Sequence, residues 1–167
     1  MAPDDRTLEL RFIEEMGRFF ESGGVPRMAG RVWAYLLIVD APYVSASDLR
    51  EGLGASAGSI STATRFLLDL RLIDRIRIPR ERRDYFAPRD GAIGELMRRR
   101  LERLTAVELL ITDALEQFGD RKHSRARLDE VHDIYHWYAQ ELPKLHERFL
   151  AERPEAGATR HEEVTSS

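Results

Sequence analysis

The sequence predicts a mainly α-helical protein that contains one small β-hairpin. Apolar residues recur at helical spacing through most of the chain, and the spacing changes to every second residue only near residues 75–87. Helical segments lie on both sides of that stretch. An apolar fraction of 43% is enough for a packed core, and a charged fraction of 33% is typical of long, solvated helices.

The first two helices are expected at residues 6–22 and 27–39. In each of them, apolar side chains recur every three or four residues and therefore share one face. Gly23 and Gly24 end the first helix, and Pro42 closes the second. Two successive helices are thus predicted before any strand.

Two shorter helices are expected next, each with its own N-terminal cap. Ser45 is followed three residues later by Asp48, whose carboxylate can accept hydrogen bonds from free N–H groups of the first turn. After a turn at Gly52–Gly54, Ser56 is a second cap and begins a helix over residues 57–70. Two capped helices around a glycine turn are typical of a helix-turn-helix.

A β-hairpin is expected directly after this pair of helices. Ile76 and Ile78 alternate with arginines, as in a half-buried strand, and residues 84–87 form the returning strand after a polar turn. The hairpin completes a winged helix-turn-helix. Three arginines cluster at the tip of this wing: Arg80, Arg82 and Arg83.

Two long helices are expected after the wing, at residues 92–118 and 125–150. Pro143 should kink or interrupt the second. The apolar stripes of these helices and of the first helix are wider than one small domain needs. They indicate a homodimer interface, with an intramolecular bundle as the alternative. The predicted organisation is a dimerisation helix at 1–24, a winged helix-turn-helix domain at 25–90, dimerisation helices at 91–150 and a disordered tail at 151–167.

The charge of the chain is unevenly distributed. The net charge is −3, but residues 65–103 hold 12 Arg against 7 Asp or Glu, a balance of +5. The rest of the chain holds 14 Lys or Arg against 22 Asp or Glu, a balance of −8. This asymmetry favours one basic face that binds an acidic partner such as DNA. The alternative is an ordinary solvated helix surface that carries charges of both signs.

The helix at 57–70 has the properties of a DNA recognition helix, because one side is apolar and the other carries short polar side chains. Serine and threonine reach phosphates or base edges in the major groove, and arginine can bond guanine bidentately. Arginines of the wing can enter a minor groove or bind the flanking backbone. The alternatives are an ordinary amphipathic helix and a charged tip that only prevents strand pairing. The candidate residues on the helix are Ser56, Ser59, Ser61, Thr62 and Arg65.

Other classes of protein are excluded or disfavoured. The absence of cysteine excludes disulfides, thiolate catalysis and cysteine-based zinc sites. The chain has no signal peptide and no apolar run of the ~20 residues that a membrane span needs, so we expect a cytoplasmic protein. It also lacks recognisable catalytic motifs, so we expect no enzyme and no cofactor. His132 and His136 lie one turn apart, but without the glutamate of a zinc-protease helix we expect no metal.

Five stretches of the chain resemble GbsR-type regulators of the bacterial MarR superfamily. The resemblance spans about residues 8–118, and VPRMAGR and GSISTATRFL are its most specific parts. It implies a homodimer that binds an inverted-repeat operator in double-stranded DNA, commonly as a repressor. A protein-interaction module that kept the fold without DNA binding is the competing hypothesis. The matching stretches are Phe12–Gly17, Gly24–Leu37, Ser47–Leu53, Ser56–Ile73 and Arg82–Phe86.

The resemblance also implies a small lipophilic or phenolic effector that releases the DNA. Four aromatic residues can line a pocket for it, although the spacing of the two on the last helix also fits core packing, which we favour. These residues are Trp33, Tyr35, Tyr135 and Tyr138.

Three arginines lie at positions where the resemblance to these regulators is informative: one departs from the family pattern and two match it. Arg71 stands where such regulators usually have glycine in a left-handed helix cap, so we expect modest strain or a different cap geometry. Arg27 and Arg31 match the family stretch and can contact phosphate or form a structural ion pair. We favour the ion pair.

Overall fold

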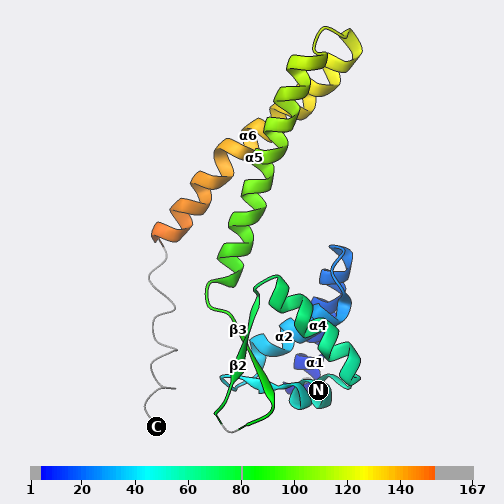
Figure 1. Cartoon of the computed structure of the whole chain (residues 1–167), viewed down its shortest axis with the longest axis vertical. Helices are drawn as coiled ribbons and strands as arrows, with labels where there is room; N and C mark the ends of the chain where they lie inside the picture. Colours follow the sequence, from blue (N-terminus) through cyan, green and yellow to red (C-terminus); the bar gives the residue numbers. More distant parts are fainter. Residues whose placement is uncertain (1–4, 80, 153–167) are drawn as a thin grey trace. The chain divides into compact units, whose positions relative to one another are not determined.

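A computed structural model describes residues 5–79 and 81–152 of the chain (Figure 1). The chain forms two compact units, Met1–Ala92 and Ile93–Ser167. In the described residues, the first unit contains four helices and a small sheet, and the second contains two long helices. The predicted division into dimerisation and DNA-binding segments concerns function and stays a prediction.

The predicted fold class, mainly helical with a small antiparallel sheet, is confirmed. Each predicted helix is present, and its ends lie within three residues of the expected ones. The elements are α1 (Asp5–Ser22), α2 (Arg27–Ile38), β1 (Val44–Ser45), α3 (Ala46–Leu53), α4 (Ala57–Asp69), β2 (Ile73–Arg77), β3 (Asp84–Pro88), α5 (Ala92–Phe118) and α6 (Lys122–Glu152).

The sheet has three strands in the order β1-β3-β2, with both pairs antiparallel. Sequence analysis missed β1, because two residues are too few to show a period of two. Val44 pairs with Phe86 of β3, and Ser45 also caps the following helix. The alternation placed Ile78 in the first strand of the wing, but β2 ends one residue earlier. Strand β1 therefore connects the wing to the start of α3.

The core of the first unit is built around α2, which contacts α1, α3, α4 and β3. Gly30 permits the close packing of α1 on α2, because a Cβ there would lie 2.8 Å from the carbonyl oxygen of Met16. The apolar side chains that fill this core are Ile13, Val32, Trp33, Leu36, Leu49, Leu53, Ile60, Leu67, Leu72, Ile73 and Phe86.

An ion cluster holds α1, α2 and α3 together. The Arg27 and Arg31 guanidinium groups lie 2.7 and 2.8 Å from the Glu14 carboxylate. Arg31 also donates a hydrogen bond of 2.9 Å to the carbonyl oxygen of Leu53 at the end of α3. The hydrogen bond from Arg27 is the main cause that lowers the pKa of Glu14. The ion-pair interpretation of Arg27 and Arg31 is therefore confirmed.

Arg71 adopts a left-handed backbone conformation, at a position where the regulators that the sequence resembles usually have glycine. Its φ of 57° is the one positive φ of a non-glycine residue in the described parts of the chain. The Arg71 N–H donates to Leu68 and the Leu72 N–H donates to Leu67, both at 2.9 Å, which is the Schellman pattern at the end of α4. The cap geometry is thus retained, and the expected consequence is strain.

Replacing Arg71 by glycine should stabilise the protein. Left-handed backbone costs an L-residue roughly 1–2 kcal/mol, and the greater freedom of glycine in the unfolded chain offsets about 0.4–1 kcal/mol of that gain. We expect the free energy of unfolding to rise by roughly 0.5–1 kcal/mol in urea titrations. Arg71→Ala is the control, since it removes the charge and keeps the strain. If the free energy of unfolding rises equally in both variants, the cause is the loss of the charge and not the release of strain.

The second unit is a pair of helices, α5 and α6, that run in opposite directions and lie beside each other (Figure 1). Pro143 lies inside α6 and does not interrupt it. Ala151 and Glu152, which were predicted to belong to a disordered tail, still lie in α6. The rest of the predicted tail, residues 153–167, lies outside the described part of the chain. Among the described helices, none is long and apolar enough to span a membrane.

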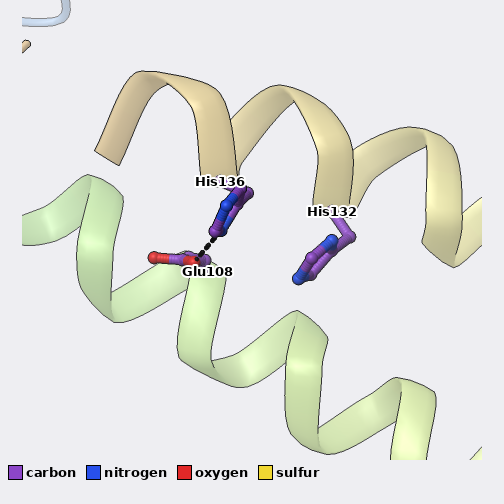
Figure 2. Close-up of side chains that lie close together, drawn as sticks. All are labelled: Glu108, His132 and His136. Carbon is purple, nitrogen blue, oxygen red and sulfur yellow. Dashed lines mark hydrogen bonds and ion pairs between the residues drawn. The ribbon is translucent and has the colours of Figure 1, made fainter. Parts of the chain in front are cut away.

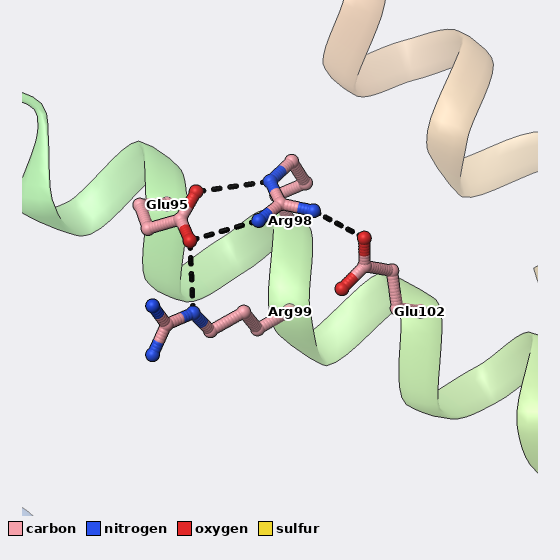
Figure 3. A network of polar contacts seen from close by, with 4 residues as sticks. All are labelled: Glu95, Arg98, Arg99 and Glu102. Carbon is pink, nitrogen blue, oxygen red and sulfur yellow. Dashed lines mark hydrogen bonds and ion pairs between the residues drawn. The ribbon is translucent and has the colours of Figure 1, made fainter.

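Charged residues form a ladder near the N-terminus of α5 (Figure 3). Glu95 accepts hydrogen bonds of 2.8 Å from Arg98 and Arg99, and Arg98 also donates to Glu102. The bonds from Arg98 and then Arg99 lower the pKa of Glu95 to about 2. Glu95 lies in the first turn of α5, where the helix dipole also favours a carboxylate. The ladder therefore keeps this exposed end of α5 charged and solvated.

Candidate nucleic-acid interface

The helix-turn-helix is held by caps at both of its helices. The Ser45 hydroxyl accepts a hydrogen bond from the Asp48 N–H, and the Asp48 carboxylate accepts one of 2.8 Å from the Ser45 N–H. The Ser45 hydroxyl also donates a hydrogen bond of 2.8 Å to that carboxylate. The bond from the Ser45 N–H, and then the one from its hydroxyl, lower the pKa of Asp48. Gly54 ends α3 at a φ of 59°. The capping box predicted from the sequence is present, and it fixes where α3 begins.

The predicted recognition helix, α4, has one buried face and one exposed face. Thr64 belongs to the buried face, and its hydroxyl donates 2.9 Å to the carbonyl oxygen of Ile60. Ser56 caps the helix by accepting a 3.2 Å hydrogen bond from the Ser59 N–H. The five candidate residues are all exposed to solvent: Ser56, Ser59, Ser61, Thr62 and Arg65.

A groove runs between α3, α4 and the strands of the wing. Arg65 lines it from α4, together with Arg50 from α3 and Arg75 from β2. Sequence analysis did not select Arg50 or Arg75. The exposed positions of β2 alternate with half-buried ones, which was a signal for Arg75, but only the folded unit brings all three arginines to one groove. The groove residues are Ala46, Ser47, Arg50, Ala57, Ile60, Ser61, Thr64, Arg65, Arg75, Asp84 and Phe86.

The wing presents two exposed arginines, Arg82 and Arg83, in the loop between β2 and β3. Arg83 lies near enough to Asp48 to help lower the pKa of that carboxyl. No ion pair is formed by Arg82 within residues 5–79 and 81–152. The third predicted wing residue, Arg80, lies outside the described residues.

The four aromatic residues predicted for an effector pocket belong to different units. Trp33 is 5% exposed and lies in the core of the first unit. The Tyr35 ring packs against Gly52, where a Cβ would collide with it. In the second unit, Tyr135 is half-buried and Tyr138 is 43% exposed. The pocket therefore stays a prediction.

The two histidines on α6 have a neighbour that sequence analysis did not identify. Glu108 of α5 lies 2.6 Å from the Nδ1 atom of His136, and His132 stacks on His136. Glu108 is 24 residues before His132 and on another helix, so no local spacing connects them.

Comparisons with known proteins agree with this architecture. The family model described as the MmpR5-like MarR family transcriptional regulator matches residues 91–152. The HTH-type transcriptional regulator MmpR5 of Mycobacterium tuberculosis is 35% identical over 126 residues, which are 75% of this chain and 76% of the relative. A crystal structure of a transcriptional regulator has a TM-score of 0.66 and 31% identity, over 86% of this chain and 98% of the other.

The sequence relative carries the assignment, because the similarity extends over three quarters of both chains. The family model adds the long helices α5 and α6, which the resemblance noted from the sequence covered only in part. The chain belongs to the MmpR5-like MarR family of winged-helix transcriptional regulators, and it is not an enzyme.

Proposed function

We propose that this regulator binds double-stranded DNA sequence-specifically in the cytoplasm, as a homodimer on an inverted-repeat operator, and represses transcription. One observation carries the proposal: the exposed polar face of α4 adjoins a groove lined by Arg50, Arg65 and Arg75. A closer kinship with GbsR-type regulators is a finer proposal that rests on the matching sequence stretches.

Base reading is assigned to the exposed face of α4. Ser59, Ser61 and Thr62 are short enough to let the helix approach base edges, and Arg65 is long enough to bond a guanine bidentately. Arg65 has no ion pair among the described residues, so its guanidinium is available. The cap at Ser56 leaves the first N–H groups of α4 near the surface, where they favour a phosphate.

Phosphate binding is assigned to the wing and to the groove. Arg82 and Arg83 extend beyond the strands, and Arg50 and Arg75 flank α4. Arg75 is also 3.7 Å from Asp84, so its charge is partly balanced within the unit. Arginine contacts to phosphate supply affinity and orient the protein without reading sequence.

The homodimer is supported by the second unit, which buries almost none of its apolar side chains in the single chain. Ala139 is the one buried residue among the described positions from Ile93 onward. Exposed apolar surface of this extent marks an interface between proteins. The large apolar side chains that stay exposed on α5 and α6 are Ile93, Leu109, Leu110, Phe118, Val131, Ile134, Trp137, Tyr138, Leu145, Phe149 and Leu150.

Release by a small-molecule effector is a further part of the proposal. Tyr135 and Tyr138 are its better candidates, because both reach the surface of the second unit, whereas Trp33 is occupied by core packing. A tyrosine offers a flat apolar ring and one hydroxyl, which suits a phenolic ligand.

Selection of bound fragments from genomic DNA at moderate salt tests DNA binding directly. A sequence-specific regulator should enrich a few fragments that share an inverted repeat. Retention of no fragment, or of all fragments equally, would contradict specific binding and favour a protein-interaction module.

Removing both described wing arginines should weaken DNA binding broadly. Each phosphate contact contributes about 0.9 to the slope of log affinity against log salt, so Arg82→Ala with Arg83→Ala should reduce the slope by about 1.8 per wing. Affinity for operator and for random DNA should fall together, as measured by fluorescence anisotropy over a range of salt.

The matched control removes two exposed arginines from α1, through Arg11→Ala and Arg18→Ala. Those side chains lie outside the groove, so the salt slope should be retained despite the same loss of charge. An unchanged salt slope in the wing variant would show that Arg82 and Arg83 do not contact DNA phosphates.

A further inference from the structure

Glu108, His132 and His136 form a compact cluster between α5 and α6 (Figure 2). The Glu108 Oε1 atom lies 2.6 Å from the His136 Nδ1 atom. The two imidazole rings are stacked, with centroids 5.5 Å apart and planes 13° from parallel. One potential ligand atom from each residue lies within 4.8 Å of the other two. Figure 2 shows both rings on the side of α6 that faces α5.

The carboxylate in this cluster is shielded from solvent. The Glu108 side chain is 13% exposed, and the side chain that it contacts within the described residues is the His136 imidazole rather than a lysine or arginine. His132 is half-buried, and it also lies 3.8 Å from Asp133, a carboxylate that is 86% exposed. A shielded carboxylate that meets two imidazoles and no permanent cation favours a positively charged ligand beside it.

We propose that Glu108, His132 and His136 bind one divalent transition-metal ion of the zinc class, which joins α5 to α6. Two imidazole nitrogens and one carboxylate oxygen form a donor set that zinc accepts, and three protein ligands leave a fourth position for water. Calcium and magnesium prefer six or more oxygen ligands, which this cluster does not offer. The inference concerns metal binding alone and does not depend on the DNA-binding proposal.

The observed distances suit an ion after small side-chain rotations. A tetrahedral ion about 2.1 Å from each ligand requires ligand atoms roughly 3.4 Å apart. The Glu108–His136 contact of 2.6 Å must therefore widen, and the longest separation, up to 4.8 Å, must shorten. The histidines are one turn apart on α6, so their backbone already places both on one side of the helix.

The sequence alone did not favour this site, because two histidines one turn apart lack a third ligand. Glu108 supplies that ligand from the neighbouring helix. A metal here would also cross-link a helix pair in which Ala92 and Ala139 are the only buried residues among the described positions of α5 and α6. Zinc binding should therefore raise the stability of this helix pair substantially.

Titration of the tag-free protein with zinc chloride in a calorimeter tests the proposal. We expect one zinc per chain and a rise in the melting temperature. The variants Glu108→Gln, His132→Gln and His136→Gln should each weaken zinc binding by more than ~100-fold, since loss of even an outer-shell partner costs 10–100-fold. His146→Gln is the matched control, because His146 is another half-buried histidine of α6 outside the cluster.

Cobalt provides a second readout, since its visible absorption reports the coordination geometry. The cobalt spectrum of a four-coordinate site should appear in the native chain and in His146→Gln, and disappear in the three ligand variants. Helix content measured without metal identifies any variant that fails to fold. The variants that do fold then show whether the three residues bind the metal. Absence of zinc binding at micromolar concentration, or binding that survives all three ligand substitutions, would overturn the proposal.

Discussion

Leu110→Asp should convert the proposed homodimer to monomers and remove most of the operator affinity. Leu110 is 66% exposed on α5 in the single chain, so a carboxylate there is tolerated by the monomer and excluded from an apolar interface. Central interface residues contribute 2 kcal/mol or more to binding, so the dissociation constant of the dimer should rise at least ~30-fold. Losing the second half-site should then cost about 100-fold or more in affinity for an inverted repeat. Analytical ultracentrifugation and anisotropy measure the two effects.

Gln117→Glu is the matched control for this substitution. It adds the same charge to an exposed position of the same helix and deletes no apolar surface. Its dimer and its operator affinity should be those of the unchanged chain. A Leu110→Asp protein that sediments as a dimer would place the dimer contacts elsewhere. Affinity for a single half-site should be unaffected, because the first unit is unaltered.

Arg65→Ala should weaken operator binding much more than binding to random DNA. A bidentate contact between arginine and guanine discriminates against the wrong base by about 1–3 kcal/mol, which is roughly 5- to 150-fold for each half-site. Arg65 lies on the exposed face of α4 and in the groove, and alanine is compatible with the helix. Competition between the operator and random DNA measures the ratio.

Arg65→Lys separates base reading from charge. Lysine keeps the positive charge but cannot form the paired hydrogen bonds of a guanidinium. Affinity for random DNA should therefore be retained, and the preference for the operator should fall nearly as far as in Arg65→Ala. Equal losses on operator and random DNA in Arg65→Ala would assign Arg65 to phosphate.

Local sequence signals predicted most of the fold correctly, because the elements concerned depend on neighbouring residues. The capping box at Ser45 and Asp48 involves positions three apart, and it forms as expected. The left-handed cap at Arg71 is likewise local, although an arginine there runs against the usual preference. Helix periodicity is local too, which is why α5 was predicted with its observed ends.

The features that sequence analysis missed depend on contacts between distant residues. Strand β1 is defined only by its pairing with β3, 40 residues later. Arg50 and Arg75 join Arg65 in one groove because α3, α4 and β2 pack together. The alternation in β2 marks Arg75 as exposed, but no local pattern places either arginine beside Arg65, so only the packed unit brings them together.

The sequence by itself determined the order of the helices, the position of the wing and the polar face of α4, because periodicity and capping act over a few residues. Only the tertiary structure decided that Arg27 and Arg31 pair with Glu14, that Trp33 fills the core, and that Glu108 meets the two histidines. Those contacts join separate helices, and their geometry follows from how whole helices pack.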